Sequence, residues 1–436
     1  MLFSDIMIQI CDVYVLLAHL KNKMNTVIIM VEIFFLEVFI MNKIQRVGEL
    51  ERKYVEEVLS NNFRSSAGYK MTKRLEDAFA EKFGVNYAVA FCNGTATLHA
   101  ALEVLGVREG DEVIVPPLTM SSTTFCVLQA NATPIFADVD PDTFQISAKS
   151  IEERITPRTK AIIPVALYGL SPDFDAIKAV AKKHNLAILE DDAQCFLGKY
   201  KGQTVGSIGD IASFSFQGSK HITCGEGGML TTNSEELADK IRKYSCLGYA
   251  SVGTKSGKIA KNDIQAPDYS RHLHMGWNYR MSDVCSAVAL GQVERLEELV
   301  EVRTESARIF NEAIAGNKIL IPQKVDADYV NSYWCYTAKL VDDNIGWRTF
   351  RDKYLELGGD GVYGAWKLAY QEPMFETMNF LGREKYLTEN ANYKTGICPN
   401  AEYLQPRLMQ FKTNYYDLEV AKVKAEALAK TIKYFE

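Results

Sequence analysis

The sequence lacks the cysteine and histidine patterns of several protein classes. Its nine cysteines are scattered over 436 residues, and no two of them form a Cys-x-x-Cys pair. This spacing argues against a disulfide framework and a cysteine zinc site, and it is typical of buried thiols in a reducing compartment. Histidine is also scarce, with six residues, and none lies at ligand spacing beside an acidic pair. We therefore predict no metal site.

A basic surface is missing as well. The formal net charge is −6, and no stripe of lysine and arginine interleaved with aromatic residues is present. These features argue against nucleic-acid binding. The 47% hydrophobic and 24% charged residues are those of an ordinary soluble globular protein. No internal repeat or low-complexity segment is present, and the length allows two or three domains.

The first 40 residues differ in texture from the rest of the chain. They contain two apolar runs, Ile6–Leu20 and Thr26–Met41. Acidic residues interrupt these runs at Asp12, Glu32 and Glu37. A membrane span needs about 20 mainly apolar residues, and charges in its middle are costly. The basic region and small-residue cleavage site of a secretory signal are also missing. We expect residues 1–40 to be an apolar extension outside the fold, with the functional start at Met41. A membrane-associating anchor and a structured extension are the alternatives.

Short apolar runs of strand length alternate with helix-like segments over much of the chain. The runs with strand character are Tyr87–Phe91, Glu112–Pro116, Pro134–Val139, Lys160–Leu167, Ala187–Glu190, Ile211–Phe216 and Gly227–Thr232. The segments with helix character are Val47–Leu59, Lys73–Phe83, Ala96–Leu105, Ser121–Gln129 and Pro172–His184. This alternation predicts an α/β architecture with a seven-stranded, mostly parallel sheet.

The texture changes again near residue 290. We expect a long charged helix at Val293–Ala315, a strand at Tyr333–Val341 and helices at Trp347–Leu357 and Leu418–Tyr434. The sequence therefore predicts a large domain over residues 41–290 and a smaller α+β domain over residues 291–436.

One lysine has an unusual setting. Lys220 follows the apolar run that ends at Phe216 and precedes the Gly-rich turn at Gly227. Burying an ammonium group is costly, so a lysine between two buried strands needs a reason. One interpretation is an amine made nucleophilic by its surroundings, which condenses with an aldehyde cofactor. The other is a solvated loop lysine.

A possible anion site lies at Asn93-Gly94-Thr95-Ala96, between a strand-like and a helix-like run. Free backbone N–H groups at a helix N-terminus attract anions. Gly94 lets the backbone approach closely, and Thr95 is expected to cap the helix and donate its hydroxyl. An ordinary capped turn is the alternative.

Three consecutive acids follow the strand-like run from Ala187. Glu190, Asp191 and Asp192 lie at the expected carboxyl end of the strand, where open α/β sheets bind ligands. A carboxylate buried there needs a cationic partner. Spacing alone does not choose among the three acids, and a paired-carboxylate metal site is a competing interpretation.

Taken in order, four motifs resemble the DegT/DnrJ/EryC1/StrS family of pyridoxal-phosphate (PLP) sugar aminotransferases. The motifs are NGTAT (Asn93–Thr97), AILEDDAQ (Ala187–Gln194), SFQGSK (Ser215–Lys220) and GWNYRMSD (Gly276–Asp283). The resemblance runs from about Ile44 to the C-terminus. It implies the aspartate-aminotransferase-like fold of fold-type-I PLP enzymes.

The resemblance also implies roles for individual residues. Lys220 would carry the cofactor, Asp191 would pair with its protonated pyridine nitrogen, and Gln194 would contact its ring hydroxyl. The phosphate would be held by Gly94, Thr95, Ala96 and Ser215. Asn278 would reach the phosphate in the neighbouring subunit, so a homodimer with shared active sites is expected. The polar loop Asn61–Tyr69 would lie near the substrate.

Three departures from the family pattern bear on the site. Met120 stands where the family usually has an aromatic residue stacked on the cofactor ring, and a thioether can also pack on that face. The segment Pro164–Gly169 lacks a histidine that the family often has. The run Ala401–Tyr415 departs from the usual ending, and we expect it to shape the substrate entrance.

The resemblance predicts a cytoplasmic PLP-dependent aminotransferase of amino-sugar and polysaccharide biosynthesis. It would pass an amino group from glutamate or glutamine to a keto or aldehyde sugar by ping-pong chemistry. A nucleotide-linked keto sugar, an eight-carbon keto-acid sugar and a cyclitol ketone remain open as substrates. One rival is a PLP-dependent sugar 3-dehydratase, in which histidine replaces the lysine; here Lys220 is present and His221 follows it. The other rival is a catalytically silent protein of the same fold.

Overall fold

The computed structural model describes residues 44–63, 71–253 and 265–436. The expectations for residues 1–40 and for most of the loop Asn61–Tyr69 lie outside these residues. The chain from Val47 to Glu436 forms one unit, and the domain boundary near residue 290 stays a prediction. No helix within the described ranges is long and apolar enough to cross a membrane.

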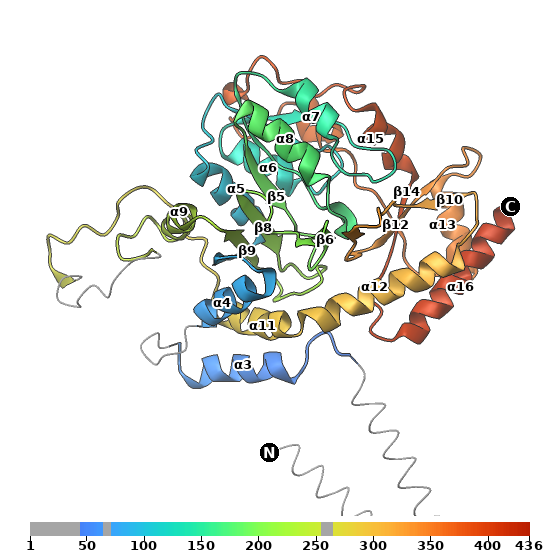
Figure 1. Cartoon of the computed structure of the whole chain (residues 1–436), viewed down its shortest axis with the longest axis horizontal. Helices are drawn as coiled ribbons and strands as arrows, with labels where there is room; N and C mark the ends of the chain where they lie inside the picture. The colour runs from blue at the N-terminus through green and yellow to red at the C-terminus, as the bar shows by residue number, and fades with distance from the viewer. Residues whose placement is uncertain (1–43, 64–70, 254–264) are drawn as a thin grey trace, which may run out of the picture. The chain divides into compact units, whose positions relative to one another are not determined.

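A seven-stranded sheet lies at the centre of this unit (Figure 1). Its strands are β1 (Tyr87–Phe91), β2 (Glu112–Val115), β3 (Thr133–Phe136), β4 (Thr159–Ile162), β5 (Ala187–Asp191), β8 (Ile211–Ser215) and β9 (Gly228–Thr232). They are ordered β1-β9-β8-β5-β4-β2-β3. Only β9 runs against its neighbours, β1 and β8, and the other pairs are parallel. The predicted mostly parallel sheet is confirmed.

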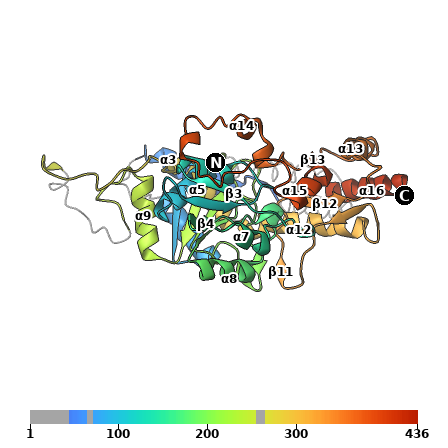
Figure 2. The same cartoon turned by 90° about the horizontal axis from the view of Figure 1, so that it is seen from above.

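Both faces of the sheet are buried, because alternate side chains along each strand enter two different cores. On β2, Val113 and Val115 pack into one core, whereas Ile114 packs into the other. The first core lies under α5 (Gly94–Val104) and α6 (Ser122–Gln129), and the second under α7 (Ala148–Arg154) and α8 (Phe174–His184). Figure 2 shows α8 and the short helix α14 (Pro373–Glu376) on opposite sides of the central sheet. Burial on two faces explains why the strands appear in the sequence as continuous apolar runs.

The helix boundaries follow local capping chemistry. The carboxylate of Asp173 accepts the N–H of Ala176 at 3.2 Å and begins α8. The helix ends at Asn185, which adopts a left-handed conformation with φ of 55°. Asparagine tolerates this conformation better than most residues. Helix α9 (Glu235–Ser245) begins in the same way, with Ser234 as its cap. This helix was not predicted from the sequence.

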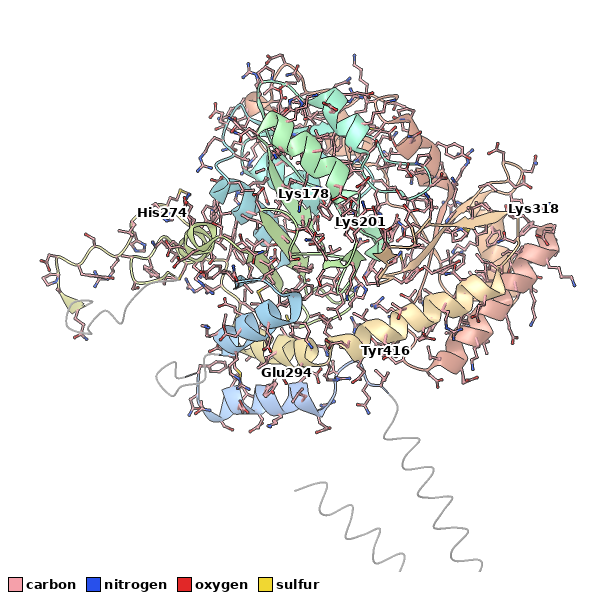
Figure 3. All side chains as sticks on the ribbon, viewed as in Figure 1. Lys178, Lys201, His274, Glu294, Lys318 and Tyr416 are labelled. Atoms are coloured by element: carbon pink, nitrogen blue, oxygen red, sulfur yellow. The ribbon has the colours of Figure 1, made fainter. Side chains whose placement is uncertain are left out.

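Three helices pack together at the amino-terminal end of this unit. They are α3 (Glu49–Ser60), α4 (Met71–Phe83) and α11 (Asp283–Glu294). Glu294, labelled in Figure 3, is the last residue of α11 and accepts the hydroxyl of Tyr54 on α3 at 2.7 Å. Helix α12 (Leu296–Ala313) follows directly. The expected long charged helix is confirmed as α12, but its predicted start at Val293 was wrong, because Val293 and Glu294 belong to α11.

The break between α11 and α12 lies at Arg295, whose φ and ψ of −106° and 15° are not helical. Its guanidinium forms ion pairs with Glu51 at 2.9 Å and Glu298 at 2.8 Å. Glu51 is 1% exposed, so a cation beside it removes the cost of an unpaired buried carboxylate.

A smaller part of the fold follows at the C-terminus, as predicted. Its four-stranded antiparallel sheet has the order β10-β12-β14-β13. The strands are β10 (Leu320–Pro322), β12 (Tyr336–Leu340), β13 (Tyr363–Gly364) and β14 (Leu408–Phe411). Helices α12, α13 (Trp347–Glu356) and α16 (Leu418–Phe435) pack with it, and α15 (Pro399–Leu404) precedes β14. A third, three-stranded sheet joins β6 (Lys199–Tyr200), β7 (Gln203–Thr204) and β11 (Tyr329–Val330).

The cysteines depart in part from expectation. All eight cysteines in the described ranges are free thiols, and five of them are buried. Cys92, Cys224 and Cys285 are only half-buried. The prediction of buried thiols is therefore wrong for these three residues.

Candidate active site

A cavity of about 730 Å³ opens where the carboxyl ends of the parallel strands meet. It collects eight of the nine predicted site residues: Gly94, Thr95, Ala96, Met120, Asp191, Gln194, Ser215 and Lys220. Asn278 does not line it and is exposed. The position agrees with the general placement of ligand sites in open α/β sheets.

The first turn of α5 forms one wall of the cavity. Asn93 is extended, and its side-chain oxygen accepts the N–H of Ala96 at 2.8 Å. Asn93 is therefore the cap, and the expected capping by Thr95 is wrong, because Thr95 already lies inside the helix. The N–H groups of Gly94 and Thr95 point out of the helix N-terminus. The Thr95 hydroxyl lies 3.0 Å from that of Ser122.

Gly94 brings this helix end against strand β8. A Cβ atom at Gly94 would lie 2.9 Å from the Cβ atom of Ser215, closer than real Cβ atoms approach. Ser215 is the last residue of β8 and is 8% exposed. The close approach places the Ser215 hydroxyl beside the helix N-terminus. Together they form a cradle of N–H and O–H donors suited to an anion.

Of the three consecutive acids, only Asp191 lines the cavity. Its carboxylate accepts the Thr123 hydroxyl at 2.8 Å and the Ala193 N–H at 3.3 Å. Burial raises the pKa of Asp191, and Thr123, Ala193 and Lys220 oppose that rise. A buried carboxylate that faces a cavity in this way favours a cationic ligand group.

Glu190 and Asp192 do not line the cavity. Glu190 accepts the N–H groups of Gly206 at 2.9 Å and Ile208 at 2.7 Å, so it holds a neighbouring loop. Burial and the charge of Glu190 raise the pKa of Asp192 well above its ordinary value. The paired-carboxylate interpretation therefore has no support from the position of these side chains.

Lys220 lies on the loop between β8 and β9 and is 8% exposed. The alternative of a solvated loop lysine is therefore wrong. Burial lowers the pKa of Lys220 to about 8, partly offset by the nearby Asp191 carboxylate. The Nζ atom lies 5.0 Å from the centre of the Trp334 ring. Arg303 donates to the backbone carbonyls of Ser219 at 3.3 Å and Lys220 at 3.1 Å, which fixes the loop.

Gln194 and Met120 complete the predicted set. The Gln194 side-chain oxygen accepts the N–H of Tyr168 at 2.9 Å. This contact orients the amide, so that its two N–H donors remain for other partners. Met120 is 46% exposed at the cavity wall, and its stacking role stays a prediction.

The sequence reasoning missed several residues of the cavity. Thr123 donates a hydrogen bond to Asp191, and Trp334 and Trp366 line the cavity. A threonine inside an ordinary amphipathic run carries no signal of its own. The tryptophans offered a weak one, because the chain has only four and two of them line this cavity.

The donor set fits pyridoxal phosphate. The cradle at Gly94 and Ser215 suits a phosphate, and the buried Asp191 suits a protonated ring nitrogen. Lys220 presents an amine with a lowered pKa to the same cavity. The fold and the site together define a PLP-dependent aminotransferase. Its fold is the predicted aspartate-aminotransferase-like fold of fold-type-I PLP enzymes.

The family follows from comparison of the sequence. The model of the DegT/DnrJ/EryC1/StrS aminotransferase family matches residues 45–414, and the chain belongs to this family. The resemblance found in the four motifs is thereby confirmed, and with it the aminotransferase class and the cofactor.

Individual relatives agree with this assignment. The chain is 40% identical over 284 residues to the GDP-perosamine synthase of Escherichia coli O157:H7, covering 65% of this chain and 73% of that protein. It is 39% identical over 311 residues to the GDP-perosamine synthase of Caulobacter vibrioides, covering 70% and 78%. The solved aminotransferase of Psychrobacter cryohalolentis superposes with a TM-score of 0.76 at 29% identity, covering 89% and 97%.

Proposed function

We propose that this aminotransferase moves an amino group from glutamate or glutamine to a keto sugar carried on a nucleotide. The observation that carries the proposal is the burial of Lys220 beside Asp191 in a cavity that also contains an anion cradle. The names of the two curated relatives support a GDP-linked sugar. The eight-carbon keto-acid sugar and the cyclitol ketone are the alternative substrates.

The residues of the cavity divide the work of this reaction. When bound, pyridoxal phosphate supplies a ring that withdraws electrons from the amino carbon. The Asp191 carboxylate keeps the ring nitrogen protonated, and Gly94, Thr95 and Ser215 bind the phosphate. The Nζ atom of Lys220 takes a proton and returns it. A pKa of about 8 lets this amine act as base and as acid near neutral pH.

The rival activities are less well supported. A sugar 3-dehydratase would have histidine in place of the lysine, but here Lys220 occupies the cavity wall and His221 lies outside it. His221 is fully buried, and its Nε2 atom lies 2.9 Å from the Ser332 carbonyl. A catalytically silent protein would have no need of a costly buried lysine facing a buried acid.

Two further parts of the proposal concern assembly and location. We infer a homodimer in which Asn278 of each subunit reaches the partner's cavity. The motivation is that Asn278 is exposed and lies outside its own cavity, although it belongs to the GWNYRMSD motif. We also infer a cytoplasmic enzyme, which agrees with the free thiols of the described cysteines.

The test has two arms, because the reaction has two halves. Adding L-glutamate or L-glutamine to the purified yellow protein should shift the cofactor absorbance to that of the amine form. GDP-4-keto-6-deoxymannose should then restore the yellow form and yield a GDP-linked amino sugar by mass spectrometry. No shift with any amino donor would refute the aminotransferase proposal. A shift without turnover of the GDP sugar would leave the amino donor assigned and overturn the substrate.

The role of Lys220 is tested separately. Borohydride should fix the cofactor to the peptide that contains Lys220. Lys220→Ala should lose amino transfer while still binding pyridoxamine phosphate, because Asp191 and the phosphate cradle remain. A label on another peptide would contradict the assignment.

A further inference from the structure

A buried arginine connects the loop that carries Lys220 to two other segments of the chain. Arg303 lies within α12 and is 3% exposed. Its Nη2 atom makes the two hydrogen bonds to the carbonyls of Ser219 and Lys220 described above. Its Nη1 atom donates to the carbonyl of Trp334 at 2.6 Å and to the hydroxyl of Thr413 at 3.3 Å. One guanidinium group therefore contacts three segments that are far apart in the sequence.

The segment 332–334 also contacts the loop directly. The indole N–H of Trp334 donates to the carbonyl of Ser219 at 2.9 Å. The ring of Trp334 is the one whose centre lies 5.0 Å from the Nζ atom of Lys220. On the other side of that lysine, the Nε2 atom of His221 lies 2.9 Å from the Ser332 carbonyl. The loop and this segment are thus bound to each other, and Arg303 contacts both.

Arg303 does not line the active cavity. It borders a neighbouring cavity of about 610 Å³, which shares Ser219, Trp334 and Trp366 with the active one. Any effect of the guanidinium on the reaction therefore passes through the groups that it holds. Arginine suits such a position, because its planar group donates from two nitrogens in fixed directions, whereas lysine presents a single point charge.

The charge of Arg303 acts on the same amine. Burial lowers the pKa of Lys220 to about 8, and the positive charge of Arg303 adds to this lowering. The other titratable groups that face the amine or adjoin it are Asp191 on β5, Cys335 ahead of β12, and His221 and Glu226 on its own loop. Burial lowers the pKa of His221 and raises that of Cys335, so both are neutral near pH 7. Arg303 thus supplies a fixed positive charge that opposes protonation of Lys220.

We propose that Arg303 is a positioning residue for amino transfer, which holds the Lys220 loop against Trp334 and by its charge keeps the Lys220 amine available as a base. This inference rests on the proposed role of Lys220 as the group that carries the proton. Without the guanidinium, the loop loses its contacts to α12. Because a shift of about 1 Å in a catalytic group can cost about 100-fold in rate, Arg303→Lys and Arg303→Gln should both slow amino transfer by about 10- to 100-fold.

The first test measures the Lys220 amine in the cofactor-free protein and requires no turnover. The protein receives a brief pulse of acetic anhydride at a series of pH values, and mass spectrometry measures acetylation of the peptide that contains Lys220. The pH of half-maximal labelling should be about 8 in the wild type. It should rise to about 8.5–9 in Arg303→Gln, which removes the charge, and stay near 8 in Arg303→Lys, which keeps it.

The second test measures the rate at which the cofactor absorbance shifts with L-glutamate or L-glutamine, whichever the wild type accepts. Arg303→Lys should be slow although its labelling profile is normal, because one ammonium group cannot replace the paired donors. The matched control is Arg308→Gln on the same helix, whose exposed guanidinium pairs with Glu305 and Glu312. This control should match the wild type in both tests.

The two tests separate position from charge. A wild-type rate of amino transfer in Arg303→Lys would overturn the positioning role. An unchanged labelling midpoint in Arg303→Gln would overturn the role of the charge. Either result differs from failure of the proposed function, in which borohydride would fix the cofactor to a peptide without Lys220.

Discussion

At the scale of single residues, the cavity is governed by the cost of burying charge. Lys220 and Asp191 are 8% and 5% exposed. Burial lowers the pKa of Lys220 and raises the pKa of Asp191, so it favours the neutral form of each side chain. For Lys220 the folded pKa is about 8, below its ordinary value. At a pH between the folded pKa and the ordinary pKa of lysine, the unfolded chain binds more protons than the folded protein. The free energy of unfolding therefore rises with pH across this window.

This linkage predicts the effect of Lys220→Met on the cofactor-free protein. At pH 7 the substitution should raise the free energy of unfolding by up to about 3 kcal/mol, because it removes a buried ammonium. The gain should vanish above about pH 10.5, where the lysine is neutral in both states. Urea unfolding at the two pH values measures it. The exposed Lys318, changed to methionine, serves as control (Figure 3). Equal or lower stability of Lys220→Met at pH 7 would count against a buried ammonium.

The second prediction concerns the hydroxyl that holds Asp191. Thr123→Val should weaken pyridoxal phosphate binding by about ten- to a hundredfold, because it removes a hydrogen bond to a charged group. Thr123→Ser should restore it. The neighbouring Thr124 is a matched control, since its buried hydroxyl has no hydrogen-bond partner within the described residues. Thr124→Val should leave cofactor binding unchanged. Cofactor titration followed by absorbance measures all three variants, and equal losses at both positions would refute a specific role for Thr123.

At the scale of elements, the site depends on how closely α5 approaches β8. Contact between Gly94 and Ser215 sets that distance, and a second buried contact joins the hydroxyls of Thr97 and Ser213 at 2.7 Å. A side chain at the first position of the helix would push the two elements apart. The phosphate cradle therefore depends on this crossing of α5 over β8 and not on one sequence motif alone.

This crossing predicts that Gly94→Ala destabilises the protein by about 1–3 kcal/mol, the usual cost of overpacking. It should also reduce cofactor affinity, because the helix N-terminus moves away from Ser215. Gly218→Ala is the matched control on the loop of Lys220, since a Cβ atom there meets nothing within 4 Å. Thermal unfolding and cofactor titration check both variants. A tolerated Gly94→Ala would mean that α5 can shift without loss of the site.

The elements also show what a sequence can predict. Buried strands such as β1 and β8 were predicted to within one residue, because burial on both faces leaves an uninterrupted apolar run. The short strand β14 was missed, since it has four residues and takes its pairing from β12 and β13. The break at Arg295 depends on Glu51, which lies far away in the chain. Such tertiary causes leave no local pattern.

The site was predictable where it follows from motif chemistry. Lys220, Asp191 and Gln194 were predicted from the resemblance of their motifs to the family, because spacing alone did not choose among the three acids. Trp334 was missed as a site residue, because its approach to Lys220 requires the chain beyond β11 to return to the cavity. The capping role went to Asn93 and not Thr95, because the helix begins at Gly94, two residues before the helix-like run predicted from Ala96.

At the scale of the whole molecule, the active cavity combines distant parts of the chain. The central sheet supplies Asp191 and Ser215, and the segments around the C-terminal sheet supply Trp334 and Trp366. Asn278 joins neither wall of its own cavity. The backbone of its neighbour Tyr279 is nevertheless tied to the end of β1, through the N–H of Cys92 at 2.8 Å. The segment is thus held at the edge of the sheet with the Asn278 side chain exposed.

The last prediction tests whether that side chain serves a second subunit. If the proposed homodimer shares its sites, Asn278→Ala should weaken cofactor binding by about ten- to a hundredfold, the cost of one hydrogen bond to a charged group. Lys220→Ala should be inactive. When the two variants are mixed and exchange subunits, one site of each mixed dimer carries both lesions and the other carries neither. Activity should therefore partly return, up to about half per mixed dimer. No recovery after confirmed subunit exchange would show that Asn278 does not complete the partner's site.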